Sequence, residues 1–549
     1  MDKPTQTSTE STQSAEPTDK PVVLITEELS PAAVIALGPD VEVRRCAGTD
    51  RAALLEALPG ADAVLVRSAT RIDAEAIAAG SRLKVVGRAG VGVDNVDVPA
   101  ATRAGVMVVN APTANVVSAA ELTVGLLLAV ARNIPQAGAA LREGHWQRSR
   151  FTGVELSGKT LGIIGLGRIG SLVAQRMRGF DMRLLAYDPY VRAGNASQAG
   201  VRMTGLDELL AESDFLTVHL PRTAETTGLI GFDALQRVKP GVRLVNAARG
   251  GIVDETELYA ALKEGRVAGA ALDVFATEPC TDSPLFELDN VVATPHLGAG
   301  TIEAQARAGV AVAESVRQVL AGRCVPEAVN VHMGTVDGEL APWLALTEQL
   351  GRLLTAAAAG LRGKLLVKVA GEITGQDTTA LELAALKGAL SGVVQGDVSY
   401  VNAPLLAQER GVGSELLSAH AGAAPHHSLV TVSGALPSGE VVSVSGTLAG
   451  RGAGGRLVEV CGFEVDLALA GSMAFFRAPG GRSLVGAVGA ALGGTPIDAL
   501  QIAHGAPVAN TGNEVLLALN VGRPVTRELL DEAALSIDAT HSWSLDETA

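Results

Sequence analysis

The glycine motif GLGRIG at residues 165–170 constrains the fold of this chain more than any other feature. It follows the apolar run 161–164, and Asp188 ends a second apolar run about 20 residues further on. A strand, a glycine turn, a helix and a second strand that ends in an acid form the fingerprint of a dinucleotide-binding site. The motif therefore predicts an α/β unit with a parallel sheet.

Each glycine of this fingerprint, and the acid after it, has its own expected role. Gly165 permits the tight turn, Gly167 lets backbone N–H groups approach a pyrophosphate, and Gly170 lets the helix pack closely on the strand. Asp188 is placed to hydrogen-bond the ribose 2′-hydroxyl and would repel a 2′-phosphate. The motif therefore predicts NAD rather than NADP as the cofactor.

Length and charge exclude several kinds of protein. The 549 residues are too many for one core and suggest about three or four domains. Asp and Glu number 59 against 44 Lys and Arg, so the net charge of −15 repels phosphate backbones. Aromatic residues make up only 3% of the chain, which leaves little surface for stacking on bases. We therefore expect small molecules rather than nucleic acid as partners.

The cysteines and apolar runs do not indicate a secreted or a membrane protein. The four cysteines are scattered without CxxC spacing, so neither disulfides nor a metal site is expected, and a reducing cytoplasm fits. The longest apolar stretch, residues 122–131, is too short to span a bilayer. Residues 1–20 are rich in Thr, Ser, Gln, Glu and Pro, which predicts a disordered tail.

Short apolar runs alternate with helical patterns in the first part of the chain, as doubly wound parallel sheets require. Later, Ala-rich helices and alternating strands predict an α+β unit, and the final order of strand, helix, two strands, helix and strand is that of a ferredoxin-like module. The expected strands are 22–25, 41–43, 63–66, 85–86 and 106–109 in a first sheet, 161–164, 184–187, 215–218, 243–246, 270–274 and 291–293 in a second, and 474–477, 497–503, 514–521 and 537–543 in the last module.

These patterns divide the chain behind the tail into four domains. They are a substrate-binding domain of residues 21–117 and 300–330, a Rossmann-like NAD-binding domain of residues 118–299, an intervening domain of residues 331–470 and a terminal module of residues 471–549. A helix over 118–132 joins the first two, with Ser118 as N-cap and Glu121 at capping-box spacing. This helix is apolar nearly all round and must be buried, in its own core or against a second subunit. A homodimer or homotetramer is therefore expected.

Three residues at predicted strand ends suit the chemistry that accompanies hydride transfer. Arg249 has the planar guanidinium that grips a carboxylate with two parallel hydrogen bonds. His296 has an imidazole of the type that exchanges a proton near neutral pH, and Glu278 is able to hydrogen-bond it and fix its tautomer. Each of them alone also has a purely structural interpretation. Their common place at the carboxyl ends of parallel strands favours a catalytic set.

The chain resembles the long type of D-3-phosphoglycerate dehydrogenase, within the D-2-hydroxyacid dehydrogenases, from about residue 21 to residue 470. The matching motifs are RAGVGVDN at 88–95, GLGRIG at 165–170, NAARGGIVDE at 246–255, ALDVF at 271–275 with Glu278-Pro279, and TPHLGA at 294–299. The resemblance implies oxidation of D-3-phosphoglycerate to 3-phosphohydroxypyruvate by NAD, the first step of L-serine biosynthesis. It also implies that Arg249, Glu278 and His296 are the catalytic residues.

The resemblance further implies which residues contact the ligands. The implied NAD contacts, besides Gly165, Gly167 and Gly170, are Arg168, Ile169, Asp188, Ala247, Asp273, His296, Leu297, Gly298 and Ala299. The implied contacts with a phosphorylated 2-hydroxy acid are Arg67, Ser68, Val91, Gly92, Asn115 and Arg249. Arg67 is the expected phosphate partner, with a structural ion pair as the alternative.

The last two domains depart from the pattern of the family. There the third resembles an allosteric substrate-binding domain, and the fourth resembles an ACT domain that binds serine. Here Gly480 replaces an expected acid and Asp498 an expected asparagine, so the groups that would hold the amine of serine are altered. The segment 461–463 likewise lacks an expected arginine. The sequence therefore predicts an ACT-like domain without predicting feedback inhibition by serine.

Two other functions remain open at the level of the sequence. A glyoxylate or hydroxypyruvate reductase, or another D-2-hydroxyacid dehydrogenase, would have the same three catalytic residues. A non-catalytic NADH-sensing scaffold would share the fold without the chemistry.

Overall fold

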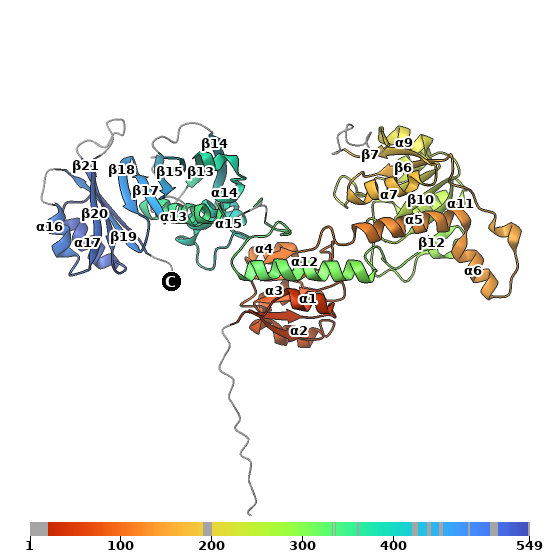
Figure 1. Cartoon of the computed structure of the whole chain (residues 1–549), viewed down its shortest axis with the longest axis horizontal. Helices are drawn as coiled ribbons and strands as arrows, with labels where there is room; N and C mark the ends of the chain where they lie inside the picture. Colours follow the sequence, from red (N-terminus) through yellow and green to blue (C-terminus); the bar gives the residue numbers. More distant parts are fainter. Residues whose placement is uncertain are drawn as a thin grey trace, which may run out of the picture.

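The computed structural model describes residues 20–189, 200–331, 333–334, 336, 338–358, 362–419, 426–435, 441–449, 454–480, 484–504 and 514–546. Apart from Lys20, the expected tail of residues 1–20 lies outside this part of the chain. The described residues form four β-sheets. Figure 1 shows an elongated row, with the first sheet (red) in the middle, the lobe of the glycine motif (yellow) at one end and the C-terminal sheet (blue) at the other.

The first sheet has five parallel strands in the order β2-β1-β3-β4-β5. Its strands β1 and β3 are buried along their whole length, which explains their unbroken apolar sequences, because helices cover both faces of a parallel sheet. The elements are β1 (Val22–Ile25), α1 (Pro31–Ala36), β2 (Glu42–Arg45), α2 (Arg51–Ala57), η1 (Leu58–Gly60), β3 (Ala63–Val66), α3 (Ala74–Ala79), β4 (Val85–Arg88), α4 (Val98–Arg103) and β5 (Met107–Val109).

The second sheet has seven parallel strands in the order β12-β11-β10-β9-β6-β7-β8. The chain runs outward from β6 to β8 and then resumes on the other side at β9, so the strand order reverses beside the glycine turn, where doubly wound sheets bind their ligands. The elements are β6 (Thr160–Ile164), α7 (Arg168–Arg178), β7 (Arg183–Tyr187), β8 (Arg202–Met203), α9 (Leu206–Glu212), β9 (Phe215–Val218), α10 (Phe232–Arg237), β10 (Val242–Asn246), α11 (Glu255–Lys263), β11 (Val267–Leu272), η3 (Pro284–Glu287) and β12 (Val291–Ala293).

The two parallel sheets confirm the predicted fold class, and one strand is displaced. β11 begins at Val267 and ends at Leu272, whereas the sequence predicts a strand over 270–274. Val267 pairs with Val242 at the start of β10, which extends the strand backward. Asp273, directly after β11, still donates its backbone N–H to the oxygen of Asn246 at 2.9 Å, while its carboxylate binds the loop that follows β12.

Two long helices connect the lobes, α5 (Val116–Arg132) and α12 (Ile302–Leu320). The shorter α6 (Ile134–Arg142) and η2 (Arg148–Phe151) follow α5 in the chain. The expected capping box at Ser118 is wrong. The helix α5 begins two residues earlier, after Asn115, without a side-chain cap. Ser118 instead shares a hydrogen bond of 2.7 Å with Thr301, the N-cap of α12, and so ties the two crossovers between the lobes together.

The apolar helix α5 is buried mainly within its own chain. Leu126 and Leu127 pack in the core of the glycine-motif lobe, beside α7 and β11. Asn133, with a left-handed φ of +51°, ends α5, and α6 starts directly after it at an angle of 64°. Among the described residues no single helix is long and apolar enough to cross a membrane, and only this bent pair taken together meets that length and composition.

The third sheet has six strands in the order β14-β13-β15-β16-β17-β18, antiparallel except for the pair β13 and β14. Helices α13 and α14 pack against each other beside it (Figure 1). The elements are α13 (Ala341–Ala358), β13 (Arg362–Gly371), η4 (Glu372–Gly375), α14 (Thr379–Ser391), α15 (Ala403–Glu409), β14 (Gly413–Ala419), β15 (Ser428–Ala435), β16 (Val441–Leu448), β17 (Gly455–Val460) and β18 (Phe463–Ala468).

The last sheet has the ferredoxin-like order β20-β21-β19-β22. The final strand starts at His541 rather than at residue 537, because Ile537 caps α17 and Asp538 turns the chain with a φ of +53°. Residues 481–483 of the altered turn lie outside the described chain, and Asp498 lies exposed on β20. The elements are β19 (Ser472–Pro479), α16 (Leu484–Ala491), β20 (Ile497–His504), β21 (Glu514–Val521), α17 (Arg527–Ser536) and β22 (His541–Leu545).

One apolar core links three of the four sheets. It extends from Val85 of the first sheet through Val312 of α12 and Leu350 of α13 to Val367 of β13 and Phe475 of β19. The second sheet has two cores of its own, one on each side. The lobe of the glycine motif is therefore packed separately from the rest of the chain.

Candidate active site

The glycine turn joins β6 to α7 and depends on its first and last glycines. Gly165 has a φ of +100°, and a β-carbon there would lie 2.8 Å from the carbonyl oxygen of His219. A β-carbon on Gly170 would lie 2.1 Å from the carbonyl oxygen of Gly165. Only glycine at these two positions allows α7 to begin directly against the end of the strand.

Gly167 and Asp188 border the space that suits a dinucleotide. Gly167 is the N-cap of α7, and no atom lies within 4 Å of the position that its β-carbon would take. The first N–H groups of a helix lack partners within the helix, and its positive end attracts a pyrophosphate. Asp188 Oδ2 accepts a hydrogen bond of 2.8 Å from the backbone N–H of Leu166, which holds this carboxylate beside the turn. The residues present therefore fit NAD.

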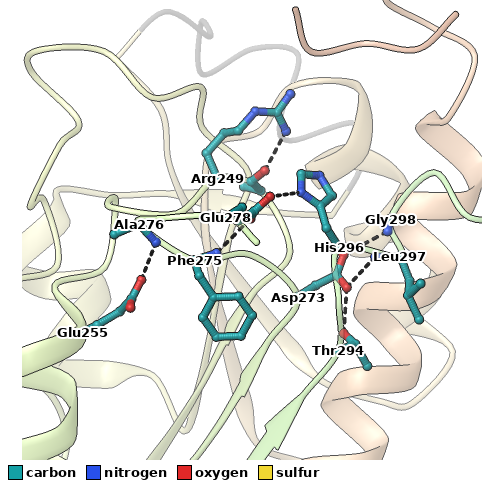
Figure 2. A network of polar contacts seen from close by, with 11 residues as sticks. Arg249, Glu255, Asp273, Phe275, Ala276, Glu278, Thr294, His296, Leu297 and Gly298 are labelled. Atoms are coloured by element: carbon teal, nitrogen blue, oxygen red, sulfur yellow. Dashed lines mark hydrogen bonds and ion pairs between the residues drawn. The ribbon is translucent and has the colours of Figure 1, made fainter. Parts of the chain in front are cut away.

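The predicted pair of His296 and Glu278 is brought together in the structure. His296 Nδ1 lies 2.6 Å from Glu278 Oε2 (Figure 2). The other carboxylate oxygen of Glu278 accepts a hydrogen bond of 2.9 Å from the backbone N–H of Phe275, so the carboxylate is held at both ends. An imidazole that donates from Nδ1 keeps Nε2 as its proton acceptor. The pair thus has the geometry of an oriented base.

Asp273 anchors the loop that carries His296. Its carboxylate is fully buried and accepts hydrogen bonds of 2.7, 2.7 and 2.8 Å from the Thr294 hydroxyl and from the backbone N–H groups of Leu297 and Gly298. Within this loop His296 has a φ of +55°, a conformation that residues other than glycine rarely adopt. Its predicted role as a cofactor contact stays a prediction, and in the structure its carboxylate also fixes the backbone around His296.

Arg249 joins the group from the loop after β10 (Figure 2). Its Nη1 donates a hydrogen bond of 2.7 Å to the backbone oxygen of Ala248. Its Nη2 would lie 3.0 Å from a β-carbon on Gly92, in the turn after β4 of the first sheet. The guanidinium therefore reaches from the glycine-motif lobe to the turn of the first lobe, where a side chain on Gly92 would displace it.

Arg88, at the end of β4, is a site residue that the sequence reasoning did not assign. Its Nη1 would lie 1.5 Å from a β-carbon on Gly90, so the guanidinium rests on the same glycine turn. Its Nε is buried and has no hydrogen-bond partner among the described residues. Burial lowers the pKa of Arg88 below its ordinary value. Arg88 ends a strand whose other residues are buried, but the spacing of residues alone does not separate it from other charged strand ends.

Several charged residues lie close enough to Arg88 to change its pKa. Asp94 and Glu27 oppose the lowering of the pKa of Arg88, whereas the positive charges of Arg249 and Arg67 add to it. Arg88 and Arg249 lie against the same glycine turn of residues 90–92, and the charge of Arg67, whose Nη1 donates to the backbone oxygen of Glu28 at 3.3 Å, also acts on Arg88. We call Arg67, Arg88 and Arg249 the arginine cluster.

The other predicted ligand contacts lie around these groups, and their roles stay predictions. Ser68 is exposed in the loop after β3, Val91 lies in the glycine turn, and Asn115 directly precedes α5. The predicted cofactor contacts Arg168 and Ile169 form the first turn of α7, Ala247 follows β10, and Leu297, Gly298 and Ala299 follow His296.

A second histidine near the glycine turn, His219, is buried and does not take up a proton near neutral pH. His219 follows β9, and its Nε2 lies 3.0 Å from the hydroxyl of Thr217. Burial of the ring lowers the pKa of His219 to about 4, so the imidazole stays uncharged near neutral pH.

Known sequences identify the family. Residues 124–298 match the model of the NAD binding domain of D-isomer specific 2-hydroxyacid dehydrogenases, and residues 339–461 match that of the D-3-phosphoglycerate dehydrogenase intervening domain. The D-3-phosphoglycerate dehydrogenase of Mycobacterium tuberculosis is 51% identical over 94% of this chain and 98% of its own length. This chain belongs to that family. The enzyme of the same name from Methanocaldococcus jannaschii is 38% identical over 93% of this chain and 97% of its own.

Solved structures are similar to the first two lobes of this D-3-phosphoglycerate dehydrogenase family member. A glyoxylate reductase from Paecilomyes thermophila is 30% identical and matches 57% of this chain and 98% of its own with a TM-score of 0.52. An NAD-dependent formate dehydrogenase from Staphylococcus aureus, solved with NAD, is 31% identical and matches 57% and 99% with a TM-score of 0.51. The predicted family, cofactor and enzyme class are confirmed: the chain is an NAD-dependent oxidoreductase, which leaves the scaffold hypothesis without support.

The glycine turn yields a contrast between two alanine substitutions. Gly170→Ala is expected to lower the melting temperature of the NAD-free protein by several degrees, because its β-carbon overlaps the carbonyl of Gly165. Gly167→Ala meets no protein atom, so it should leave the melting temperature unchanged while weakening NAD binding about tenfold or more, some 1.4 kcal/mol. Thermal unfolding and fluorescence titration with NAD measure the two effects, and equal effects of both substitutions would contradict these assignments.

Proposed function

We propose that this chain oxidises the C2 hydroxyl of D-3-phosphoglycerate to the ketone of 3-phosphohydroxypyruvate with NAD, the first step of L-serine biosynthesis. The names of its relatives support this proposal, and the arginine cluster carries it. A 2-hydroxy acid with only a carboxylate needs one guanidinium, whereas a phosphate adds about two negative charges at neutral pH. Arg67 and Arg88 supply the further positive charge on the side of the first lobe.

The proposed mechanism assigns one task to each group. Arg249 binds the substrate carboxylate and so fixes the orientation of C2. His296 Nε2 accepts the proton of the C2 hydroxyl, while Glu278 holds Nδ1 and stabilises the imidazolium that forms. Bound NAD supplies the acceptor for the hydride. Asp273 keeps the loop of His296 in place throughout.

Removal of the base tests this mechanism. His296→Ala is expected to lower kcat by about 10² to 10⁴-fold, the usual contribution of a general base, and to change the Kd of NAD far less. Glu278→Gln should lower kcat less, because the imidazole remains but its partner no longer carries a charge. Steady-state kinetics and NAD titration give both quantities, with His541→Ala on β22 as the control. An unchanged kcat in His296→Ala would remove this residue from the mechanism.

The arginine cluster separates the proposed substrate from the rival one. Arg88→Met is expected to lower kcat/KM for D-3-phosphoglycerate about 10 to 100-fold, equivalent to about 1.4 to 2.7 kcal/mol, because a charged contact is lost. The kcat/KM for glyoxylate or hydroxypyruvate, which carry no phosphate, should change little. Arg45→Met on β2 is the matched control. If the wild type prefers the unphosphorylated acids, the glyoxylate or hydroxypyruvate reductase function takes the place of the proposed one.

We further propose that two or four copies of the chain associate through α6 and the loop after it. Ile134 and Leu141 are 57% and 56% exposed on α6, and Trp146 beyond it is 78% exposed. Clustered apolar side chains of this size mark a protein interface. The expected oligomer therefore depends on α6, rather than on the largely buried α5.

The mass of the particle in solution tests whether the chains associate through α6. The double substitution Leu141→Ser and Trp146→Ser is expected to reduce the mass measured by light scattering to that of a single chain, because it removes apolar surface from the proposed contact. Leu535→Ser, at a residue of α17 that is 80% exposed, is the control. A wild-type mass of one chain, or an unaltered mass of the double variant, would contradict the proposal.

The roles of the domains and the location of the protein are part of the same proposal. We assign substrate binding to residues 21–117 and 300–330, NAD binding to residues 118–299, and regulation or assembly to the intervening domain of residues 331–470 and the ACT-like domain of residues 471–549. The four cysteines are free thiols, which suits a reducing cytoplasm.

A further inference from the structure

Glu27, which lies just beyond β1, has an unusual set of hydrogen bonds for a carboxylate near a substrate site. Its Oε1 accepts the backbone N–H groups of Arg67 and Thr70 at 2.8 and 2.9 Å, and its Oε2 accepts that of Ala69 at 3.2 Å. Three N–H groups of one short loop thus converge on a single side chain. The loop of residues 67–70 is the one expected to contact the substrate.

Asn95 holds the same loop from its carbonyl side. Its Nδ2 donates to the backbone oxygens of Arg67 and Thr70 at 2.7 and 2.6 Å. Thr70 is buried, and its hydroxyl lies 2.9 Å from that of Thr26. The loop is therefore held by side chains from two other segments, residues 26–27 and Asn95, while Ser68 remains exposed.

Converging backbone N–H groups of a loop form a nest that binds anions. Here the anion is part of the chain itself, because the Glu27 carboxylate occupies the nest. A substrate phosphate cannot use these N–H groups and must be bound by side chains. Glu27 also opposes the burial effect on the pKa of Arg88, which shows that its charge reaches the arginine cluster.

We propose that Glu27 is a positioning residue that acts as an internal anion. It fills the nest of the 67–70 loop and thereby aims Arg67 at the phosphate of the substrate. This inference deepens the proposed function and rests on it, because it takes the substrate to be phosphorylated. Glu27 itself touches neither substrate nor NAD in this scheme.

The experiment empties the nest and refills it with a small carboxylate. Glu27→Ala is expected to raise the KM for D-3-phosphoglycerate about 10 to 100-fold with the Kd of NAD unchanged, because Arg67 is no longer aimed. Added formate should bind the vacant N–H groups and lower that KM again. Formate should also raise the melting temperature of Glu27→Ala but not that of the wild type, a readout that needs no substrate.

Three further variants make the test specific. Arg67→Ala should raise the KM without any rescue by formate, and Glu56→Ala, on the exposed side of α2, should behave as the wild type. Glu27→Gln keeps the size of the side chain and tests the inference even if Glu27→Ala fails to fold. It should raise the KM, because the NH2 group of its amide, a donor, takes the place of the oxygen that accepts the N–H of Ala69.

The outcomes separate this inference from the proposed function. An unchanged KM in Glu27→Gln, or a folded Glu27→Ala in which formate changes neither the KM nor the melting temperature, would overturn the inference. If the wild type does not oxidise D-3-phosphoglycerate, the proposed function fails. A formate-dependent melting temperature in Glu27→Ala would then still support the occupied nest.

Discussion

The site depends on the constraint that all strands of a parallel sheet end at the same edge. Arg67 and Arg88 follow strands of the first sheet, and Arg249 and His296 follow strands of the second. Because Arg249 of the second lobe lies against the turn of Gly92 in the first, residues remote in sequence form one group of charges. The loops between strands and helices then need only to aim the side chains, which is the task of Asp273 on one side and of Glu27 on the other.

Charge compensation gives this edge its chemical character. The positive charges of Arg67 and Arg249 act on Arg88 and, together with burial, lower its pKa. The carboxylates of Asp94 and Glu27 offset part of this repulsion. The remaining positive charge, together with the buried Nε of Arg88, which has no hydrogen-bond partner in the described part of the chain, makes the region suitable for a multiply charged anion. On the opposite side, the hydrogen bond between Glu278 and His296 directs one imidazole nitrogen toward proton transfer.

The distribution of apolar cores suggests how the lobes cooperate. The first sheet shares one core with the intervening and terminal sheets, whereas the glycine-motif lobe is packed on its own. The connections between these two bodies are the segments that enter α5 and α12, which Ser118 and Thr301 tie together. A movement that brings Arg249 closer to the first lobe would therefore bend at these segments, because packed cores resist deformation.

The sequence by itself determined the fold class, the cofactor and the family, because a glycine fingerprint and strand-end motifs are local patterns whose physical meaning survives without neighbours. It also identified His296 and Glu278 as a pair. It did not determine the cap of α5, because Ser118 forms its hydrogen bond with Thr301, far away in the chain. Nor did it determine the hydrogen bonds of Asp273, whose oxygens bind a loop more than twenty residues later. Arg88 and Glu27 emerged only from the tertiary structure. Their importance lies in burial and in contacts between separate strands, and neither is encoded in the spacing of residues along the chain.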